Sequence, residues 1–366
     1  MKETEKESGK FPPCGYGATG LCCSSCLLGP CRISPFETNS AKGSCGDDAD
    51  MVVAKNLLRL VAREAASGLK DLGEAVRNLG ASASTKGTRK VPAREVKSII
   101  QKYGLTSRVS LRRLNSYLLR ESERLLSTLS EPGRPSPLVS SLYPEGAFPY
   151  IDRDAFLPDS LTNLIFDAFS HDQNESSAVE VILWQCLKTS VITFISEELR
   201  QDMHYLTHGE WLLEIETEAL DVVDHPPPKP LPVVVLFSRE DGLHKGLMNR
   251  TAQDLQQELK GDVLHFRIRD IGHLPTIGRR FFQKWSLSVA EVGAIVVAFS
   301  QSTASVLGAL ACGFTVVSLP ALPIHGSDVV EKFFCVDLKE KLGSVYLPPR
   351  AGEVLPVILE YLGRKV

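Results

Sequence analysis

Apolar residues recur at helical spacing through the N-terminal half of this chain. The spacing predicts helices over five ranges: 48–70, 92–103, 108–129, 158–170 and 177–206. In the third of these, Leu111, Leu114, Leu118 and Leu125 follow the helical repeat. The stretch 131–141 is rich in proline and serine and is predicted to be a loop. We therefore expect a helical bundle in this half.

The pattern changes after residue 232, where short β-branched runs alternate with helical segments. Strands are predicted at 233–237, 263–267, 294–299, 315–319 and 344–347. Helices are predicted between and after them at 249–260, 276–285, 302–312, 326–334 and 351–363. Alternation of this kind is typical of a parallel sheet with helices on both faces. The predicted fold class is thus α followed by α/β, with a Rossmann-like doubly wound sheet in the second half.

A proline-rich segment separates the two patterns. It reads HPPPKPLP at 225–232 and is predicted to be a stiff linker. Residues 1–10 are polar and are expected to form a disordered tail. The chain is therefore expected to hold an N-terminal domain over 11–224 and an α/β domain over 233–366.

Composition narrows the possible partners and location. The chain has 366 residues, is 43% hydrophobic and carries a formal net charge of −3. Such a weak charge, without a long basic stripe, predicts neither nucleic acid nor a membrane surface as a partner. The charged N-terminal sequence MKETEKESGK is unlike a secretory signal, and the apolar runs are too short to span a bilayer. We expect a cytoplasmic protein.

The strongest chemical signal is a cluster of cysteines. Six of the nine cysteines lie in one short segment, which we call the cysteine loop: Cys14, Cys22, Cys23, Cys26, Cys31 and Cys45. Crowding of this kind in a chain without a secretory signal favours a metal site over disulfides. Ligation by thiolates without histidine suits an iron–sulfur cluster or a structural zinc ion.

Six thiolates are two more than one four-ligand cluster needs. Adjacent Cys22 and Cys23 point in different directions in most backbone conformations, so they are better placed to hold two neighbouring clusters. A natural division gives four ligands to a cluster within the subunit: Cys23, Cys26, Cys31 and Cys45. Cys14 and Cys22 would then complete a second four-thiolate site with the same pair from a two-fold related copy. The count itself thus indicates a homodimer.

The cysteine loop resembles a known family. The runs CGYGATGLCCSSCLLGPCRI and GSCGDDADMVVAKNLLRLVA are similar to the N-terminal cluster region of nickel-containing anaerobic carbon monoxide dehydrogenases, and all six cysteine positions and the five intervals between them match. The resemblance implies a 4Fe–4S cluster in each subunit, on the last four cysteines. It also implies one 4Fe–4S or 2Fe–2S cluster shared across the dimer, on the first two. A weaker resemblance continues through the helical half and into the C-terminal segment ACGFTVVSLPALPIHGS.

The same resemblance exposes a difference. The family oxidises carbon monoxide at a nickel–iron–sulfur centre held by one histidine and five cysteines of its sheet domains. Outside the cysteine loop this chain keeps only three cysteines: Cys186, Cys312 and Cys335. Ser300 and Gln301 stand where a ligand cysteine is expected, and Ser238 and Arg239 stand nearest the expected histidine. Such side chains do not replace thiolates. We therefore expect no nickel and no carbon monoxide oxidation, and a chain shortened within one sheet domain.

Several functions stay open. The leading hypothesis is an electron-transfer homodimer with a redox partner, either ferredoxin-like or an enzyme complex, working without oxygen. A second is a reductase or ligand-binding protein that uses the vacated α/β pocket, since strand ends are where such sheets bind ligands. Its predicted pocket residues are Ser238, Arg239, Ser300, Gln301 and His325. A third is a structural or regulatory iron–sulfur subunit, and a fourth is an anaerobic carbon monoxide dehydrogenase itself.

Two further motifs are weaker. His204 and His208 stand four residues apart near a helix end, a spacing that can bind metal, although a solvated pair is the simpler reading. Gly15, Gly17 and Gly20 spell a dinucleotide fingerprint, but the motif lies among cysteines rather than between a strand and a helix. We expect these glycines to let backbone amides approach cluster sulfurs.

Overall fold

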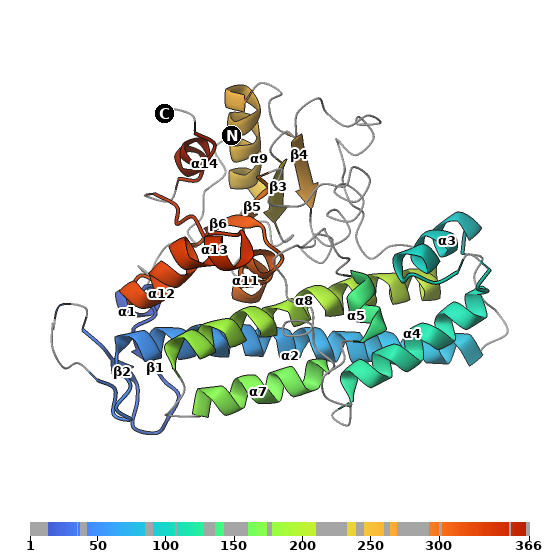
Figure 1. The fold of residues 1–366 in the computed structure, drawn as a ribbon, viewed down its shortest axis with the longest axis horizontal. Helices are drawn as coiled ribbons and strands as arrows, with labels where there is room; N and C mark the ends of the chain where they lie inside the picture. Colours follow the sequence, from blue (N-terminus) through green and yellow to red (C-terminus); the bar gives the residue numbers. More distant parts are fainter. Residues whose placement is uncertain are drawn as a thin grey trace, which may run out of the picture.

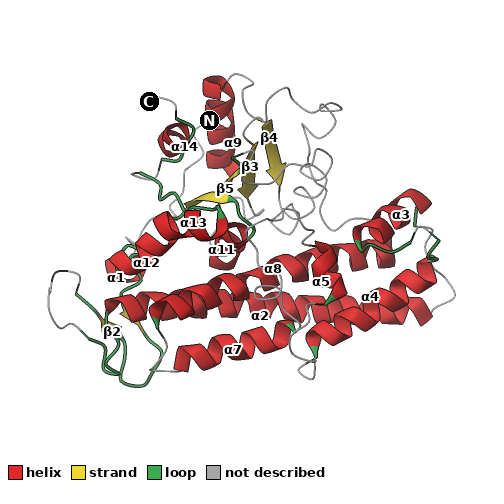
Figure 2. Cartoon of the chain, in the orientation of Figure 1, coloured by secondary structure: helices red, strands yellow, loops and turns green. Residues whose placement is uncertain are grey.

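A computed structural model describes most of the chain. It covers residues 14–34, 36, 42–84, 91–106, 108–127, 136–142, 160–173, 178–209, 233–238, 245–259, 264–268, 293–299, 302–350 and 353–363. The predicted tail 1–10, the proline linker 225–232 and the predicted helix 276–285 lie outside these residues. Within the described residues, long helices form one layer. A small sheet, together with the helices that pack on it, lies on one side of this layer (Figure 1; Figure 2).

Two long helices form the centre of the helical layer. Helix α2 spans Ala49–Ser84 and helix α8 spans Val179–His208, and they lie side by side along much of their length (Figure 1). Asp48 caps α2 by accepting a 3.0 Å hydrogen bond from the amide of Met51. Helix α8 ends at Gly209, whose φ of 78° suits glycine.

Shorter helices complete the layer. They are α3 (Ala93–Lys102), α4 (Leu111–Leu126), α5 (Pro137–Leu142) and α7 (Leu161–Gln173). Helices α4 and α7 pack against α2, and the leucines predicted to share one face of α4 include the fully buried Leu114, Leu118 and Leu125. The bundle predicted from the apolar repeat is therefore confirmed in the residues described.

The C-terminal half builds a parallel sheet of four strands in the order β4-β3-β5-β6. The strands are β3 (Val233–Ser238), β4 (Leu264–Ile268), β5 (Ile295–Phe299) and β6 (Thr315–Leu319). Every neighbouring pair is parallel. The order of the strands reverses after β4, so β3 and β5 are neighbours although β4 lies between them in sequence.

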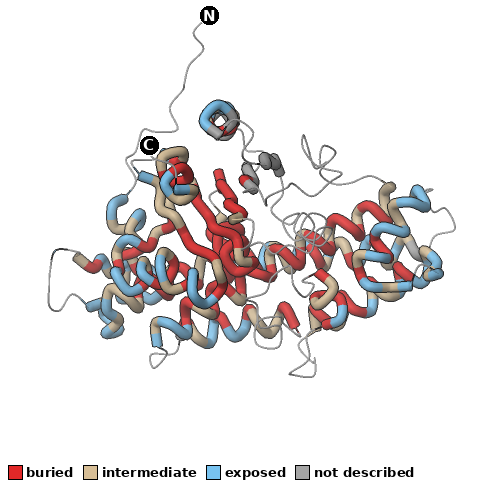
Figure 3. The backbone as a smooth tube through the Cα atoms, turned by 45° about the horizontal axis from the view of Figure 1, so that its top comes forward, coloured by how far each residue is buried: buried red, intermediate tan, exposed pale blue. Residues whose placement is uncertain are grey.

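Both faces of the sheet are covered by helices. On one face, Ile295, Val297 and Phe299 of β5 share an apolar cluster with α9 (Lys245–Leu259) and α14 (Leu355–Tyr361). The alternate residues Val296 and Ala298 belong to the main core, together with α11 (Thr303–Ala311) and α8. Figure 3 shows that buried positions follow the sheet and the central helices.

Helix α11 sits very close to α8. A side chain added at Gly308 would place its Cβ 2.2 Å from a ring carbon of Phe194. Glycine at this position therefore lets the two helices approach, and the contact joins the sheet region to the helical layer.

Four local predictions need correction. The first helix runs to Ser84 rather than 70, and a helical turn, α5, ends the stretch predicted as a loop. The fifth strand at 344–347 is reduced to a single bridge between Val316 and Tyr346, because Pro348 and Pro349 follow and offer no amide to extend the ladder.

The helix predicted over 326–334 also needs correction, because three consecutive helical parts run from Asp328 to Leu342. They are α12 (Asp328–Lys332), a π-helix, η3 (Phe333–Asp337), and α13 (Leu338–Leu342). Cys335 lies half-buried within the π-helix.

Helix α8 is long and apolar enough to cross a membrane by length and composition alone. However, 67% of its most apolar window is buried inside the protein, where it packs against α2, α7 and α11. Within the described part of the chain, this helix is accounted for as the core helix of the bundle.

Candidate metal centre

The cysteine loop lies against the N-terminal end of α2 (Figure 1). It contains a two-residue hairpin in which β1 (Cys22–Cys23) pairs with β2 (Cys31–Arg32), so that Cys23 stands opposite Cys31. Successive side chains of a strand point to opposite faces. Accordingly, Cys23 is buried while Cys22 is partly exposed. The two adjacent side chains therefore lie on opposite faces of the hairpin.

Two glycines bring the other cysteines of the predicted cluster close to this hairpin. A Cβ added at Gly29 would lie 3.1 Å from the carbonyl oxygen of Cys23, 3.4 Å from that of Cys26 and 3.5 Å from the amide of Cys31. A Cβ added at Gly43 would lie 3.5 Å from the sulfur of Cys45 and 3.9 Å from Cβ of Cys31. The loop thus gathers all four predicted ligands around two positions without side chains.

The sulfurs in this cradle have polar neighbours. Ser44 donates its amide to Cys31 Sγ at 3.4 Å, and the Ser25 hydroxyl lies 3.1 Å from Cys23 Sγ. Arg59 of α2 donates a further hydrogen bond to Cys23 Sγ at 3.6 Å. Donors directed at sulfur stabilise a thiolate, which is the form that binds metal.

The balance of forces on Cys23 favours the thiolate. Burial raises the pKa of this thiol, but hydrogen bonds from Ser25 and Arg59, together with the positive charge of Arg59, outweigh the burial and leave the pKa lowered. A lowered pKa makes this thiol easier to deprotonate, as metal binding requires.

Cys14 occupies a different position. It is exposed and precedes the short helix α1 (Gly15–Ala18), where the backbone amides of Gly17 and Tyr16 lower its pKa. The glycine fingerprint falls on this helix and its end. Gly20, with φ of 82°, packs so closely that an added Cβ would lie 2.4 Å from the carbonyl oxygen of Pro323. This glycine is therefore explained by packing.

The donor set fits a cubane cluster. All six cysteines of the loop are free thiols. Among the residues that the structure describes, no three His, Cys, Asp or Glu side chains converge as the ligands of a single metal ion do. Four thiolates are the ligand number of an iron–sulfur cubane, and a structural zinc ion takes the same number.

Helix α2 fixes the loop at both ends. Asn56 donates to the carbonyl oxygens of Gly20 at 2.8 Å and Cys22 at 2.9 Å. Lys55 forms a 3.0 Å ion pair with Asp47, and both side chains are largely buried. The helix predicted to follow the cysteines therefore also positions them.

The predicted α/β pocket is described only in part. His325 lies in a loop that packs on the cysteine loop, since Gly326 donates its amide to the carbonyl of Thr19 at 2.9 Å. The Nδ1 atom of His325 is 3.1 Å from a carboxylate oxygen of Glu331. Ser238 ends β3, whereas Arg239, Ser300 and Gln301 lie outside the described residues. The pocket stays a prediction.

Sequence reasoning missed a carboxylate at the end of β5. Glu64 of α2 accepts hydrogen bonds from the Ser302 hydroxyl at 2.8 Å and from the amides of Ala304 at 2.9 Å and Thr303 at 3.3 Å. It therefore occupies the N-terminus of α11, which is the place where open α/β sheets receive anionic ligands. The two segments are 238 residues apart, and no local pattern marks the contact.

We expect Glu64→Ala to lower the free energy of unfolding by about 2 kcal/mol, because three donors lose a charged acceptor. Glu64→Gln should lose about half as much, since it keeps one acceptor oxygen. Urea unfolding would measure both. Glu74→Ala, at an exposed position of the same helix, is the control. Equal, small losses in all three variants would contradict a capping role.

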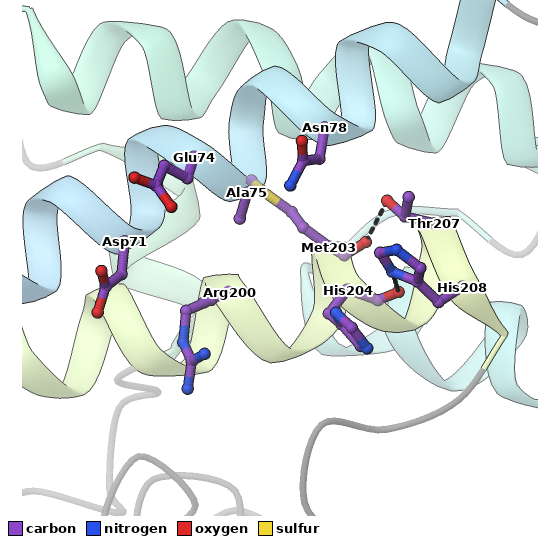
Figure 4. Close-up of a pocket in the computed structure, with 9 residues that line it drawn as sticks. All are labelled: Asp71, Glu74, Ala75, Asn78, Arg200, Met203, His204, Thr207 and His208. Atoms are coloured by element: carbon purple, nitrogen blue, oxygen red, sulfur yellow. Dashed lines mark hydrogen bonds between the residues drawn. The ribbon is translucent and has the colours of Figure 1, made fainter.

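His204 and His208, which form the weaker candidate metal motif, line a shallow hollow between α2 and α8. The hollow measures about 280 Å³ and is also lined by Asp71, Glu74 and Arg200 (Figure 4). The rings of His204 and His208 are stacked with centroids 4.1 Å apart, and His208 Nδ1 is 3.2 Å from the carbonyl oxygen of His204. No third ligand joins them among the described residues, so the solvated pair remains the simpler interpretation.

The sequence of this chain is similar to those of known carbon monoxide dehydrogenases. Carbon monoxide dehydrogenase 1 of Methanosarcina mazei is 50% identical over 58 residues, which cover 16% of this chain and 9% of that protein. Carbon monoxide dehydrogenase of Methanocaldococcus jannaschii is 29% identical over 182 residues, which cover 49% of this chain and 28% of that protein. The chain therefore matches less than a third of the length of these relatives.

A solved structure shares the fold. It is the as-isolated, Ni-free carbon monoxide dehydrogenase from Thermococcus sp. AM4, produced without CooC maturase. It superposes with a TM-score of 0.69 at 15% identity, covering 97% of this chain and 93% of that one. The model of the Prismane/CO dehydrogenase family matches residues 21–224, more than half of the chain, and the protein belongs to that family.

Proposed function

We propose that this protein is an iron–sulfur homodimer that transfers electrons and does not oxidise carbon monoxide. The observation that carries the proposal is the gathering of four free cysteines around Gly29 and Gly43 at the end of α2. In this proposal Cys23, Cys26, Cys31 and Cys45 hold a 4Fe–4S cluster, which supplies reversible one-electron chemistry when bound.

A second cluster would lie between two copies. Cys14 is exposed and Cys22 is partly exposed, on the opposite side of β1 from Cys23, so both are accessible to a partner. Leu27 and Leu28, in the same loop, are 104% and 74% exposed. Exposed leucines beside accessible cysteines favour a covered surface over a solvated one. We propose that a second copy covers it and shares a 4Fe–4S or 2Fe–2S cluster.

The remaining cysteines support a function without nickel. Cys186 and Cys312 are fully buried in the core. Burial raises the pKa of Cys186, and it raises that of Cys335 to about 12. Thiols with raised pKa values stay protonated and are poor metal ligands. Burial of Cys186 and Cys312 and the raised thiol pKa values of Cys186 and Cys335 thus support the proposal that these cysteines do not hold nickel.

In the α/β half, one position that could receive an anionic ligand is already occupied by a side chain of this protein. We propose a Rossmann-like doubly wound domain over 233–366, preceded by the linker 225–232 and a cluster-binding helical domain over 11–224. Its parallel strand order and its helices on both faces agree with this assignment. Glu64 already fills the N-terminus of α11, so an anionic ligand there would have to displace it. The electrons would pass to a ferredoxin-like protein or an enzyme complex in an oxygen-poor cytoplasm.

Metal and sulfide analysis after oxygen-free purification tests the proposal. We expect about six irons per chain if the shared cluster is 4Fe–4S, counted as four plus half of a shared four, or about five if it is 2Fe–2S, with matching sulfide and no nickel. Zinc in place of iron, or stoichiometric nickel, would refute it. Nickel would call at once for an assay of carbon monoxide oxidation.

Replacing Cys22 by serine tests the shared cluster. We expect a weaker dimer and loss of about two irons per chain for a shared 4Fe–4S cluster, or about one for a shared 2Fe–2S cluster, because the cluster on the axis loses a ligand from each subunit. Analytical ultracentrifugation and iron analysis measure both effects. Cys335→Ser, outside the loop, should change neither. A Cys22→Ser protein with full iron and an unchanged dimer would show that this cysteine is not a ligand.

A further inference from the structure

Arg59 links the cysteine loop to the helical layer through three contacts. Its guanidinium donates to Cys23 Sγ at 3.6 Å and to Asn56 Oδ1 at 3.0 Å. A second nitrogen lies 2.8 Å from a carboxylate oxygen of Asp172 in α7. The side chain of Arg59 is 25% exposed and that of Asp172 is 7% exposed, so bulk water screens this arrangement only in part.

From this chain of contacts we infer that Arg59 sets the reduction potential of the cluster bound by Cys23, and that Asp172 opposes its effect. The inference rests on the proposed function, because it requires a cluster on Cys23. It adds a positioning and tuning role for two residues outside the cysteine loop.

The physical reason is the change of charge on reduction. An electron added to the cluster makes its ligand sulfurs more negative, and a nearby cation with an N–H directed at sulfur stabilises that state. Arg59 should therefore raise the potential. Asp172 is paired with Arg59 and offsets part of its positive charge at the cluster, so it should lower the potential.

The geometry also explains why the cation is arginine. A guanidinium offers five donors in a fixed plane, which lets one side chain reach a sulfur, an amide oxygen and a carboxylate together. Lysine carries the same charge on a single nitrogen and cannot hold all three partners in this arrangement. Lysine at position 59 should thus keep part of the electrostatic effect and lose the N–H···S contact.

Redox titrations followed by electron paramagnetic resonance test the inference on the full-length protein, purified without oxygen. The variants are Arg59→Gln, Arg59→Lys and Asp172→Asn, and the control is Arg200→Gln, which breaks a pair with Glu197 in α8. We expect Arg59→Gln to lower one cluster potential and Asp172→Asn to raise the same one. Arg59→Lys should lie between wild type and Arg59→Gln, and Arg200→Gln should match wild type. The potential of the shared cluster should move less than that of the cluster on Cys23.

Opposite shifts from the two charge-removing variants support the inference, because loss of a merely structural anchor would not change sign. Unchanged potentials at full iron content would overturn it, and so would shifts of one sign in both variants. If Arg59→Gln loses its cluster, Asp172→Asn and Arg59→Lys still decide the sign. A wild-type protein without iron and sulfide would instead refute the proposed function, which keeps the two failures distinct.

Discussion

Replacing Cys26 by serine should reduce the iron content from about six to about two per chain, since a cubane that loses one of four thiolates is rarely retained. Cys26 is exposed in the structure, and its carbonyl oxygen accepts a 3.1 Å hydrogen bond from the amide of Gly29. The substitution therefore removes a ligand without opening a cavity in the core. Iron, sulfide and visible absorbance per chain measure the loss.

The shared cluster and the dimer should survive in this variant. That outcome separates the two sites, because Cys22→Ser should show the reverse pattern. If both variants bleach the same absorbance and neither alters the dimer, the division of ligands proposed here is wrong. A matched substitution at Cys312, also a free cysteine but fully buried, tests whether any lost thiol disturbs the iron.

The parts of the fold with a local signal could be predicted from the sequence. The helical repeat gave α3, α4 and α8 nearly to their ends, and β-branched runs gave β3 to β6. The metal site is predicted from a signal of the same local kind, since all six loop cysteines lie within one short segment. The strand expected at 344–347 failed because apolar composition does not reveal how many ladder hydrogen bonds a segment can form.

Contacts between distant charged residues could not be predicted. Glu64 meets α11 across 238 residues, and Arg59 meets Asp172 from another helix. Each of these residues reads in the sequence as one more charge on an amphipathic helix, which is usually a solvated position. Only the packing of α2 against α7 and α11 shows that they are partly buried and paired.

Another such contact, among the residues described, is a network of charges between α3 and α8. Lys102 forms ion pairs with Glu198 and, at 2.7 Å, with Asp202, and Tyr103 donates its hydroxyl to Asp202. Both carboxylate side chains are only 2% exposed. Burial raises the pKa of Asp202, and the charge of Glu198 adds to this, against the opposing effect of Lys102. The positive charge of Lys102 therefore offsets the repulsion between the two buried carboxylates of Glu198 and Asp202.

Lys102→Met should lower the free energy of unfolding by about 3–5 kcal/mol, because it leaves buried charges without their partner. Since the folded pKa of Asp202 lies above its unfolded value, stability falls as pH rises between the two values. Removing Lys102 raises the folded value further, so the deficit should be larger at pH 8 than at pH 5. Urea unfolding at both pH values measures this deficit in the free energy of unfolding.

Lys341→Met is the control, because it breaks an exposed pair with Glu180 and should lower the free energy of unfolding by less than about 1 kcal/mol at either pH. Equal losses in the two variants would mean that the buried network contributes no more than a surface ion pair.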